Sequence, residues 1–391
     1  MDLVNYERIA AMKIVYILKA MAMKAGTERV MCDKINWLAD HGHKVTVVTY
    51  EQGDHPLSFP LNPDVKHIDL DVRFFKLSNI PFCCRIWKFR KMKALFATRL
   101  QNVLDYVAPN LIVTTTYSLK LSKEICNVRT EAKKMIESHS ACFSVGKEYD
   151  FRDKGILKYF ARIIDSFYFR NADSYNQLIV LTDGDKKDWE KYVRYVKTIP
   201  NPLTLYPEHI STKEPSCRIL SVGRLTFQKG FDMLIDAFAI IASSYPKWHI
   251  DIYGNGEDKE NLLNKIEKYS LQHQIRIYSP TEDIYQEYMN SDFYVLSSRY
   301  EGYPLVLNEA MSCGTPCVAF RCKYGPEDAI EDGKNGLLVK NGDVQDLADK
   351  IEWMILHEKE RIDMGEKARI AAARYKKDQV MKEWEQAYLN V

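Results

Sequence analysis

Two basic side chains stand five residues apart in a short, glycine-bounded segment, VGRLTFQKG, at 222–230. Arg224 and Lys229 come directly after RILSV, a run typical of a strand, and before a run typical of a helix. An arginine can grip a phosphate through two parallel hydrogen bonds, and a lysine supplies a compact point charge. Because such a loop lets both cations approach one anion, the segment predicts a phosphate- or diphosphate-binding site.

Two glutamates stand eight residues apart in SRYEGYPLVLNEAMSCGTPCVAF, at 298–320. Glu309 lies in an otherwise uncharged run, so we expect it to have a function rather than to be an ordinary solvated side chain. Pro304 suits the first turn of a helix, and free N–H groups at 303–306 would attract an anion such as a diphosphate. The pattern predicts that Glu301 lies in the loop before this helix and Glu309 about one turn inside it.

Two residues in the first half of the chain could also meet a ligand. Gly26, in KAMAMKAGTER, would let backbone approach a ligand where a helix begins. The segment is not GxGxxG, and Glu51 is the nearest candidate for an acidic residue after the second strand, so dinucleotide binding is disfavoured. His139, in KMIESHS, could hydrogen-bond a sugar hydroxyl as a neutral imidazole, with a purely structural role as the alternative.

The elements that position these residues alternate between strands and helices, which indicates an α/β protein with mostly parallel sheets. Strands are predicted at 13–18, 44–50, 111–114, 134–137, 178–181, 218–222, 249–253, 275–278, 293–297 and 317–320. Helices are predicted at 27–40, 230–243, 258–269, 305–313, from 344, near 361 and at 377–389. Two doubly wound halves would place the carboxyl ends of their strands, where ligands bind, around a shared cleft.

A proline-rich stretch separates the two halves. Pro200, Pro202, Pro207 and Pro215 fall close together, a density that disfavours both helix and central strand. A chain of 391 residues is also long enough for two domains. We expect an N-terminal extension at 1–11, a first domain at 12–203, a linker at 204–216, a second domain at 217–374 and a final helical segment at 375–391.

The composition is that of a soluble globular protein, with 46% hydrophobic and 28% charged residues. The 55 basic and 53 acidic side chains nearly cancel, which argues against a nucleic-acid partner held by overall charge. The sequence has no apolar run of membrane-spanning length, and its N-terminus lacks the order of a signal peptide. Nine cysteines without such a signal favour reduced thiols in the cytoplasm. Their spacing at Cys313, Cys317 and Cys322 matches no zinc site, and we expect no metal.

A basic and aromatic segment at 73–99, RFFKLSNIPFCCRIWKFRKMKALFATR, contains no acidic residue. A helix of this composition suits an anionic membrane surface, on which it would present a lipid-linked saccharide. The alternative is a solvated helix whose aromatic residues, Trp87 and Phe96 among them, pack into the core.

Taken together, these motifs resemble those of retaining nucleotide-sugar glycosyltransferases with the GT-B fold, the fourth family in the usual sequence classification. The resemblance extends from Lys13 to about Tyr388 and is strongest at GRLTFQKG, EGYPLVLNEAMSCGTPCVAF and GPEDAIEDGKNGLLVKNGDVQDLA. It implies two Rossmann-like domains that face a central cleft, with similarity to bacterial capsule and lipopolysaccharide enzymes. In this family the final helix crosses back to the first domain.

The resemblance also implies roles for the residues above. Arg224 and Lys229 would hold the diphosphate of the donor, and Glu309 would bind the hydroxyls of its ribose. Glu301 would bind the donor sugar, with help from the residues that follow it, Gly302, Tyr303, Pro304 and Leu305.

In the first domain, Gly26 would cap the phosphates and His139 would contact the donor sugar. The sequence departs from the family at Ser279 and Pro280, before the nucleobase pocket, where relatives often carry glycine. UDP is the commonest base choice in the family.

The implied chemistry is transfer of a hexose or N-acetylhexosamine to a saccharide acceptor, without a metal because no DxD motif occurs in a suitable loop. Cations fixed beside a departing diphosphate lower the barrier electrostatically. Three alternatives remain: a glycosidase that uses Glu301 and Glu309, which would leave the two cations unexplained; a GT-B phosphorylase or sugar synthase; and a non-catalytic nucleotide-sugar-binding protein.

Overall fold

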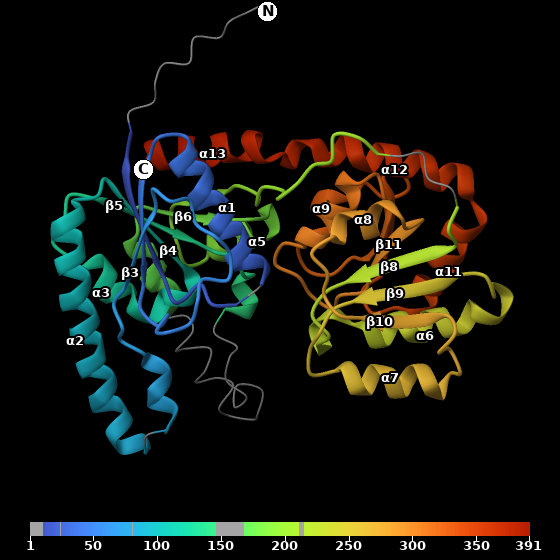
Figure 1. Cartoon of the computed structure of the whole chain (residues 1–391), viewed down its shortest axis with the longest axis horizontal. Coiled ribbons are helices and arrows are strands. Elements are labelled where there is room, and N and C mark those ends of the chain that lie inside the picture. Colours follow the sequence, from blue (N-terminus) through green and yellow to red (C-terminus); the bar gives the residue numbers. More distant parts are fainter. Residues whose placement is uncertain (1–10, 24, 80, 146–167, 211–214) are drawn as a thin grey trace, which may run out of the picture. The chain divides into compact units, whose positions relative to one another are not determined.

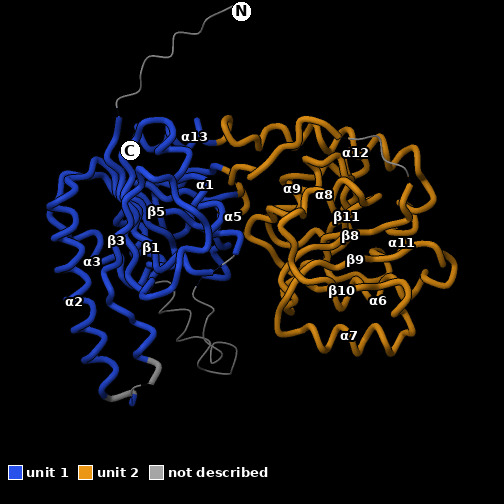
Figure 2. The backbone as a smooth tube through the Cα atoms, in the orientation of Figure 1, with its two compact units in different colours: residues 1–181, 186–199, 381–391 blue, residues 182–185, 200–380 orange. Residues whose placement is uncertain are grey.

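The computed structural model describes residues 11–23, 25–79, 81–145, 168–210 and 215–391. These form two compact units, drawn in different colours in Figure 2. Unit 1 comprises residues 1–181, 186–199 and 381–391, and unit 2 comprises residues 182–185 and 200–380. Apart from residue 11, the predicted N-terminal extension lies outside the described residues.

The passage from unit 1 to unit 2 begins at Pro200, slightly before the predicted linker. The described residues at 200–210 and 215–217 contain neither helix nor strand. This agrees with the conformational restriction that the prolines impose. The final helical segment divides between the units, because residues from Met381 onward pack with unit 1.

Unit 1 is built on a parallel seven-stranded sheet, with the order β3-β2-β1-β4-β5-β6-β7 among its described residues (Figure 1). The strands are β1 (Lys13–Leu18), β2 (Lys44–Thr49), β3 (Lys66–Asp69), β4 (Leu111–Thr115), β5 (Lys133–Glu137), β6 (Gln177–Val180) and β7 (Val196–Thr198). In β1 and β2 each residue after the first lysine is buried, as expected for parallel strands covered on both faces.

The helices of unit 1 pack their apolar sides on this sheet. They are α1 (Gly26–Asp40), α2 (Phe82–Val107), α3 (Ser122–Cys126), α5 (Asp183–Trp189), whose first residues belong to unit 2, and most of α13 (Lys377–Leu389). Phe96 and Leu100 of α2 join Val15 and Ile112 of the strands in one buried cluster. On α13, Trp384 and Tyr388 are also buried.

Unit 2 repeats the plan with a parallel six-stranded sheet, in the order β10-β9-β8-β11-β12-β13 among its described residues. The strands are β8 (Arg218–Val222), β9 (His249–Tyr253), β10 (Ile275–Tyr278), β11 (Phe293–Leu296), β12 (Cys317–Phe320) and β13 (Gly336–Val339). The helices are α6 (Phe231–Ile241), α7 (Lys259–Lys268), α8 (Ile284–Met289), α9 (Leu305–Ser312), α10 (Pro326–Ala329), α11 (Val344–Leu356) and α12 (Glu358–Ala372).

The predicted strands and helices of both units are confirmed within one or two residues at most ends. The sequence did not reveal β3, β7 and β13, which have only three or four residues each. A three- or four-residue strand is too short to establish a periodicity, and β3, KHID, carries mostly polar residues. The prediction of two parallel α/β units is confirmed.

Candidate active site

The loop that carries Arg224 and Lys229 joins β8 to α6 in unit 2 and owes its shape to glycine. Gly230 has a φ of +63°, and a Cβ there would lie 2.1 Å from the carbonyl oxygen of Ser297. A Cβ on Gly223 would lie 3.3 Å from Cδ and Cε of Lys229, so the lysine side chain passes close over this glycine. The two glycines therefore let the loop turn tightly and bring Lys229 back over the end of β8.

A second glycine pair supports this loop from the next strand, β9. Cβ atoms on Gly254 and Gly256 would lie 1.9 Å from the carbonyl oxygen of Gly223 and 2.3 Å from that of Leu225. Two backbone hydrogen bonds join the loops. The N–H of Leu225 donates to the carbonyl oxygen of Asn255 over 2.9 Å, and the N–H of Gly223 donates to that of Tyr253, the last residue of β9, over 3.0 Å. Our sequence reasoning missed these residues, although the spacing YGNG after a strand is a signal for close backbone approach.

Lys229 and Glu301 form an ion pair in which Nζ lies 2.7 Å from Oε1. Their side chains are 15% and 6% exposed, so water screens the pair poorly. A lysine ammonium has three hydrogens, and this contact uses one of them. The structure thus brings together two of the predicted catalytic residues, one from each motif.

Arg224, in contrast, is exposed. Its guanidinium makes no hydrogen bond or ion pair with the described residues. The same loop carries this unpaired guanidinium and the ammonium that Glu301 balances, which leaves it with a surplus of positive charge. This arrangement is able to hold an anion.

Glu309 lies on α9, as predicted, and Glu301 lies in the loop before it. The hydroxyl of Tyr288 donates to Oε2 of Glu309 over 3.3 Å. Burial, followed by the nearby Glu309, raises the pKa of Tyr288 well above its ordinary value, so the phenol keeps its proton and remains a donor. One carboxylate oxygen of Glu309 is in this way oriented by a buried tyrosine.

The backbone N–H groups of the turn before α9 differ in whether they have a hydrogen-bond partner. Pro304 directly precedes the helix rather than lying in its first turn. The N–H of Leu305 donates to the carbonyl oxygen of Tyr303 over 3.0 Å, so this group is directed inward. The N–H groups of Gly302, Tyr303 and Val306 make no hydrogen bond within the described part of the chain. Of the N–H groups predicted at 303–306, where Pro304 has none, those of Tyr303 and Val306 are available to an anion, and that of Gly302 joins them.

Buried side chains fix the position of that turn. The hydroxyl of Tyr303 donates to the carbonyl oxygen of Asn201 over 3.3 Å and accepts from Nδ2 of Asn308 over 2.9 Å. A Cβ on Gly325 would lie 2.2 Å from Cδ of Pro304, so the backbone of the loop after β12 packs directly on the proline ring. Tyr303 thus acts through both its side chain and its backbone.

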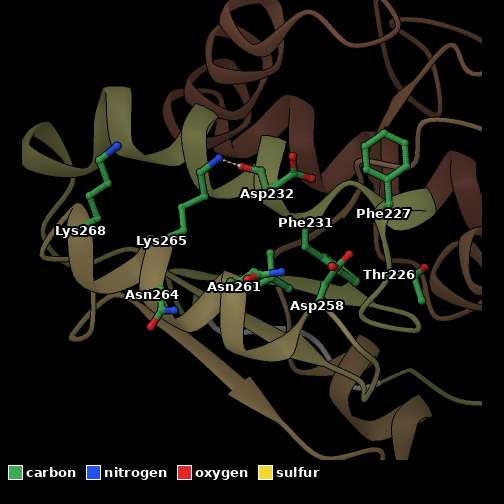
Figure 3. Close-up of a pocket in the computed structure, with 10 residues that line it drawn as sticks. Thr226, Phe227, Phe231, Asp232, Asp258, Asn261, Asn264, Lys265 and Lys268 are labelled. Carbon is green, nitrogen blue, oxygen red and sulfur yellow. Dashed lines mark hydrogen bonds between the residues drawn. The ribbon is translucent and has the colours of Figure 1, made fainter.

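A groove of about 420 Å³ lies beside the loop, between α6 and α7 (Figure 3). Two of the four charged side chains that line it form ion pairs. Asp232 forms two hydrogen bonds of 2.8 and 2.7 Å with Arg299, and Lys265 lies 2.6 Å from Oδ2 of Asp236. Because two acidic and two basic side chains line the groove, its walls carry no surplus of positive charge that would favour an anion.

In unit 1, Gly26 is exposed and is the first residue of α1. The residue before it, Ala25, provides no side-chain cap, so the N–H groups of this helix start lack a side-chain partner there. The prediction that Gly26 lies where backbone could approach a ligand is compatible with this position.

His139 follows β5 and is enclosed, with only 1% of its side chain exposed. Its Nε2 lies 2.9 Å from Oε2 of Glu137. Burial lowers the pKa of His139, which supports the predicted neutral imidazole. Nδ1 has no hydrogen-bond partner among the described residues.

The cysteines that could have suggested a metal are separate buried thiols. Cys313, Cys317 and Cys322 are at most 1% exposed, as the sequence predicted for small core side chains. Burial raises the pKa of Cys322 to about 12, so it is a thiol and not a thiolate. Within the described residues, no three histidine, cysteine or acidic side chains cluster as metal ligands would.

The basic segment at 73–99 forms a short 3-10 turn, Phe74–Asn79, and the first part of α2. Its aromatic residues divide between two environments. Phe96 is fully buried, whereas Trp87 is 62% exposed and has the ammonium of Lys91 3.6 Å from a ring centroid. The core-packing alternative therefore holds for Phe96 and not for Trp87, and contact with an anionic membrane surface stays a prediction. Among the helices described, none is long and apolar enough to cross a membrane.

Comparison with known proteins identifies the second unit. Residues 206–371 match the family model "Glycosyl transferases group 1". The chain is 24% identical over 374 residues to an uncharacterized glycosyltransferase of Haemophilus influenzae, covering 95% of this chain and 98% of the relative. It is 27% identical over 378 residues to the amylovoran biosynthesis glycosyltransferase AmsD of Erwinia amylovora, again covering 95% and 98%.

Solved structures show the fold. Sucrose-phosphate synthase from Thermosynechococcus elongatus superposes with a TM-score of 0.78 at 18% identity, covering 97% of this chain and 98% of that one. A mutant of TarM from S. aureus, in complex with fondaparinux, alpha-GlcNAc-glycerol and UDP, superposes with a TM-score of 0.75 at 17% identity, covering 96% and 100%. The chain therefore has the GT-B fold, and its residues 206–371 form a Glycosyl transferases group 1 domain.

Proposed function

We propose that this glycosyltransferase moves a hexose or N-acetylhexosamine from a nucleotide diphosphate sugar, with UDP as the nucleotide, to a saccharide acceptor. Transfer retains the anomeric configuration and serves the synthesis of a bacterial surface polysaccharide. The observation that supports it best is the contact of 2.7 Å between Lys229 and Glu301, beside the unpaired Arg224. AmsD, a relative along nearly the whole chain, is named for amylovoran biosynthesis.

The charges of the loop fit a departing diphosphate. As the bond between the anomeric carbon and the phosphate oxygen breaks, negative charge builds on that oxygen and positive charge on the sugar. Arg224 and the two remaining N–H groups of Lys229 would stabilise the phosphate, while Glu301 would face the sugar. Preorganised donors of this kind each lower the barrier by about 3 kcal/mol.

Retention would follow from attack on the face from which the diphosphate leaves. The acceptor oxygen forms its bond to the anomeric carbon, and its proton passes to the phosphate oxygen that has just been released. No carboxylate then needs to act as a nucleophile, and Glu309 is left to bind the ribose hydroxyls. In this proposal the two cations and the free N–H groups before α9 take the place of a metal ion.

The experiment is a panel of nucleotide sugars, tested for thermal stabilisation and for slow hydrolysis by the purified protein. Lys229→Ala and Glu309→Gln should both abolish turnover while the protein stays folded. Lys268→Ala removes an exposed lysine from α7 and is the matched control. Full turnover in either site variant would remove that residue from the mechanism. Phosphate dependence would indicate a phosphorylase, and stabilisation without turnover a binding protein.

The acceptor side of the proposal rests on α2. Arg85, Lys88, Arg90 and Lys91 are all exposed on this helix, next to exposed Trp87. Each lysine or arginine near an anionic surface contributes about 1 kcal/mol, and an interfacial tryptophan adds an apolar anchor. We therefore propose a peripheral position on the inner face of the cell membrane, where the enzyme meets a lipid-linked saccharide.

Vesicle flotation tests this position. The protein should float with vesicles that contain anionic lipid and remain in solution with neutral vesicles of the same size. Replacing Lys88 and Lys91 with glutamine should abolish flotation, whereas Lys268→Gln, on unit 2, should not. Binding that ignored lipid charge would overturn the membrane proposal and leave the transferase proposal intact.

A further inference from the structure

A buried carboxylate at the end of β5 accepts hydrogen bonds from two helices of unit 1 and from a histidine two residues further along the chain. Oε2 of Glu137 lies 2.7 Å from Nζ of Lys34, on α1, and 2.9 Å from Nε2 of His139. Oε1 accepts from the hydroxyl of Tyr388, on α13, over 2.7 Å. The side chains of Lys34 and Glu137 are fully buried, so the pair is held in a region of low dielectric.

The charges within this cluster determine where its protons lie. Burial by itself would raise the pKa of Glu137, but Lys34 and His139 lower it to about 2, so the carboxylate is ionised. An ionised carboxylate only accepts hydrogen bonds, and Nε2 of His139 must therefore carry a hydrogen. Because burial also lowers the pKa of His139, the ring is neutral and Nδ1 is left as an acceptor.

The C-terminal helix completes the cluster. The ring of Trp384 lies over the ammonium of Lys34, with Nζ 3.0 Å from a ring centroid. The hydroxyls of Tyr388 and Tyr16, on β1, are 2.8 Å apart. Since Tyr388 donates to Glu137, it accepts from Tyr16. Side chains from α1, α13 and β1 thus fix one carboxylate, and that carboxylate fixes His139.

The imidazole at the end of this chain of contacts presents an unused acceptor. Nδ1 is enclosed and has no hydrogen-bond partner among the described residues. An enclosed acceptor without a donor is costly, and such groups gather where ligands bind. The donor that Nδ1 lacks would be a hydroxyl group, because hydroxyls are the donors that a hexose and an N-acetylhexosamine share.

We propose that Lys34, Glu137 and Tyr388 are positioning residues, which hold His139 as the Nε2–H tautomer so that Nδ1 accepts a hydrogen bond from a hydroxyl of the transferred sugar. This inference rests on the proposed function and on the contact between His139 and the donor sugar that the family resemblance implies. It adds that the C-terminal helix sets the polarity of that contact.

Lys34 has a specific part in this arrangement. With Lys34 present, the negative charge of Glu137 is already balanced, and His139 stays neutral. Without it, the carboxylate would draw a second proton onto the imidazole. Nδ1 would then become a donor, and a cation would stand beside the sugar as it gains positive charge, which opposes the reaction.

The test uses the full-length protein labelled with ¹⁵N-histidine. In the wild type, the ¹⁵N shifts of His139 should report a neutral ring protonated at Nε2, and a UDP-sugar should move the Nδ1 resonance. Lys34→Met should raise the pH at which His139 takes up a proton by about one unit. It should also shift the acidic limb of the kcat profile by the same amount. Tyr388→Phe should lower kcat about tenfold with little change in KM.

A matched control lies on the same helix. Glu385 pairs with Nε2 of His43 at 2.8 Å, so Glu385→Gln removes another contact of α13 with unit 1. It should leave the shifts of His139 and the kcat profile unchanged. A protonated or Nδ1–H His139 in the wild type would overturn the inference. An Nδ1 resonance that does not change when the sugar is added would also overturn it, because the partner of Nδ1 would then be a bound water. Equal effects of the Tyr388 and Glu385 variants would overturn it as well.

The outcomes also separate this inference from the proposed function. If the wild type hydrolyses UDP-sugars but its His139 tautomer does not depend on Lys34, only the positioning role fails. If no nucleotide sugar is bound or turned over, the proposed function fails, whatever the tautomer of His139.

Discussion

Nζ of Lys229 and Oε1 of Glu301 lie 2.7 Å apart although the residues are separated by 72 positions in the sequence. The loop after β8 and the loop before α9 are thereby joined by one ion pair at the ends of two neighbouring strands, β8 and β11. The cation expected on the diphosphate and the carboxylate expected on the sugar hold each other in place. Each is therefore preorganised by the other before any substrate arrives.

This relationship predicts coupled stabilities. Lys229→Ala leaves a buried carboxylate without its partner and should lower the free energy of unfolding by about 1–3 kcal/mol. Adding Glu301→Gln removes that unpaired charge, so the double variant should recover most of the loss. Urea unfolding of the wild type, both single variants and the double variant measures the coupling. Strictly additive losses would show that the pair does not form in solution.

The glycine pair behind the Arg224 loop should be intolerant of any side chain. Gly254→Ala would drive a Cβ to 1.9 Å from the carbonyl oxygen of Gly223, and only a shift of backbone can relieve this. We expect a loss of more than about 2 kcal/mol in stability and weaker nucleotide binding. Gly42→Ala, where a Cβ would meet nothing within 4 Å, should cost only the strain of its positive φ, about 1 kcal/mol. Equal losses in the two variants would contradict the close loop contact.

The buried cluster around Glu137 should make unit 1 sensitive to acid. The pKa of Glu137 is about 2 in the folded protein against an ordinary 4.5, so its stabilisation is complete above about pH 4.5 and is lost as the pH falls toward 2. The lowered pKa of His139 acts in the same direction, beginning at its ordinary value of 6.5. When the pH falls from 5 to 2.5, protonation of Glu137 should lower the free energy of unfolding of the wild type by about 2–3 kcal/mol. The Glu137→Gln variant should not show this loss.

Denaturant unfolding at several pH values measures this difference in slope. A Glu137→Gln protein with an unchanged slope would show that another carboxylate governs the acid response.

Because α2 carries both exposed and buried aromatic residues, replacing one of each kind should affect membrane binding and stability in opposite ways. Trp87→Ser removes an exposed ring and should reduce flotation with anionic vesicles without changing the melting temperature. Phe96→Ala removes a fully buried ring and should cost about 3–5 kcal/mol of stability. Thermal unfolding and flotation of both variants check this. A large stability loss for Trp87→Ser would place its ring in a core and remove it from the proposed membrane surface.

The sequence predicted most of the architecture because its strands are continuous apolar runs. KIVYIL in β1 and KVTVVT in β2 are buried beyond their first lysines, and such runs differ clearly from the helices between them. The residues of the candidate site were also predictable, since Arg224, Lys229, Glu301 and Glu309 are polar residues at strand ends and helix starts. The direct pairing of Lys229 with Glu301 was not, because sequence does not fix the distance between two loops.

Other features escaped prediction for related reasons. The importance of Gly254 and Gly256 is visible only in the folded structure, because a side chain at either position would collide with the neighbouring loop. The cluster of Lys34, Glu137 and Tyr388 joins residues as many as 354 positions apart, and a lysine in an amphipathic helix normally indicates a solvated side chain. Its burial depends on a partner that only the folded chain supplies.

The participation of Tyr388 in the interior of unit 1 has a consequence for synthesis on the ribosome. Glu137 is made 251 residues before the tyrosine that donates to it. At about 5–20 residues per second, translation leaves Lys34 and Glu137 without the C-terminal helix for on the order of 10 to 50 seconds. Unit 1, whose synthesis begins first, is thus the last to be completed. All residues of unit 2 are made before α13 can pack into unit 1.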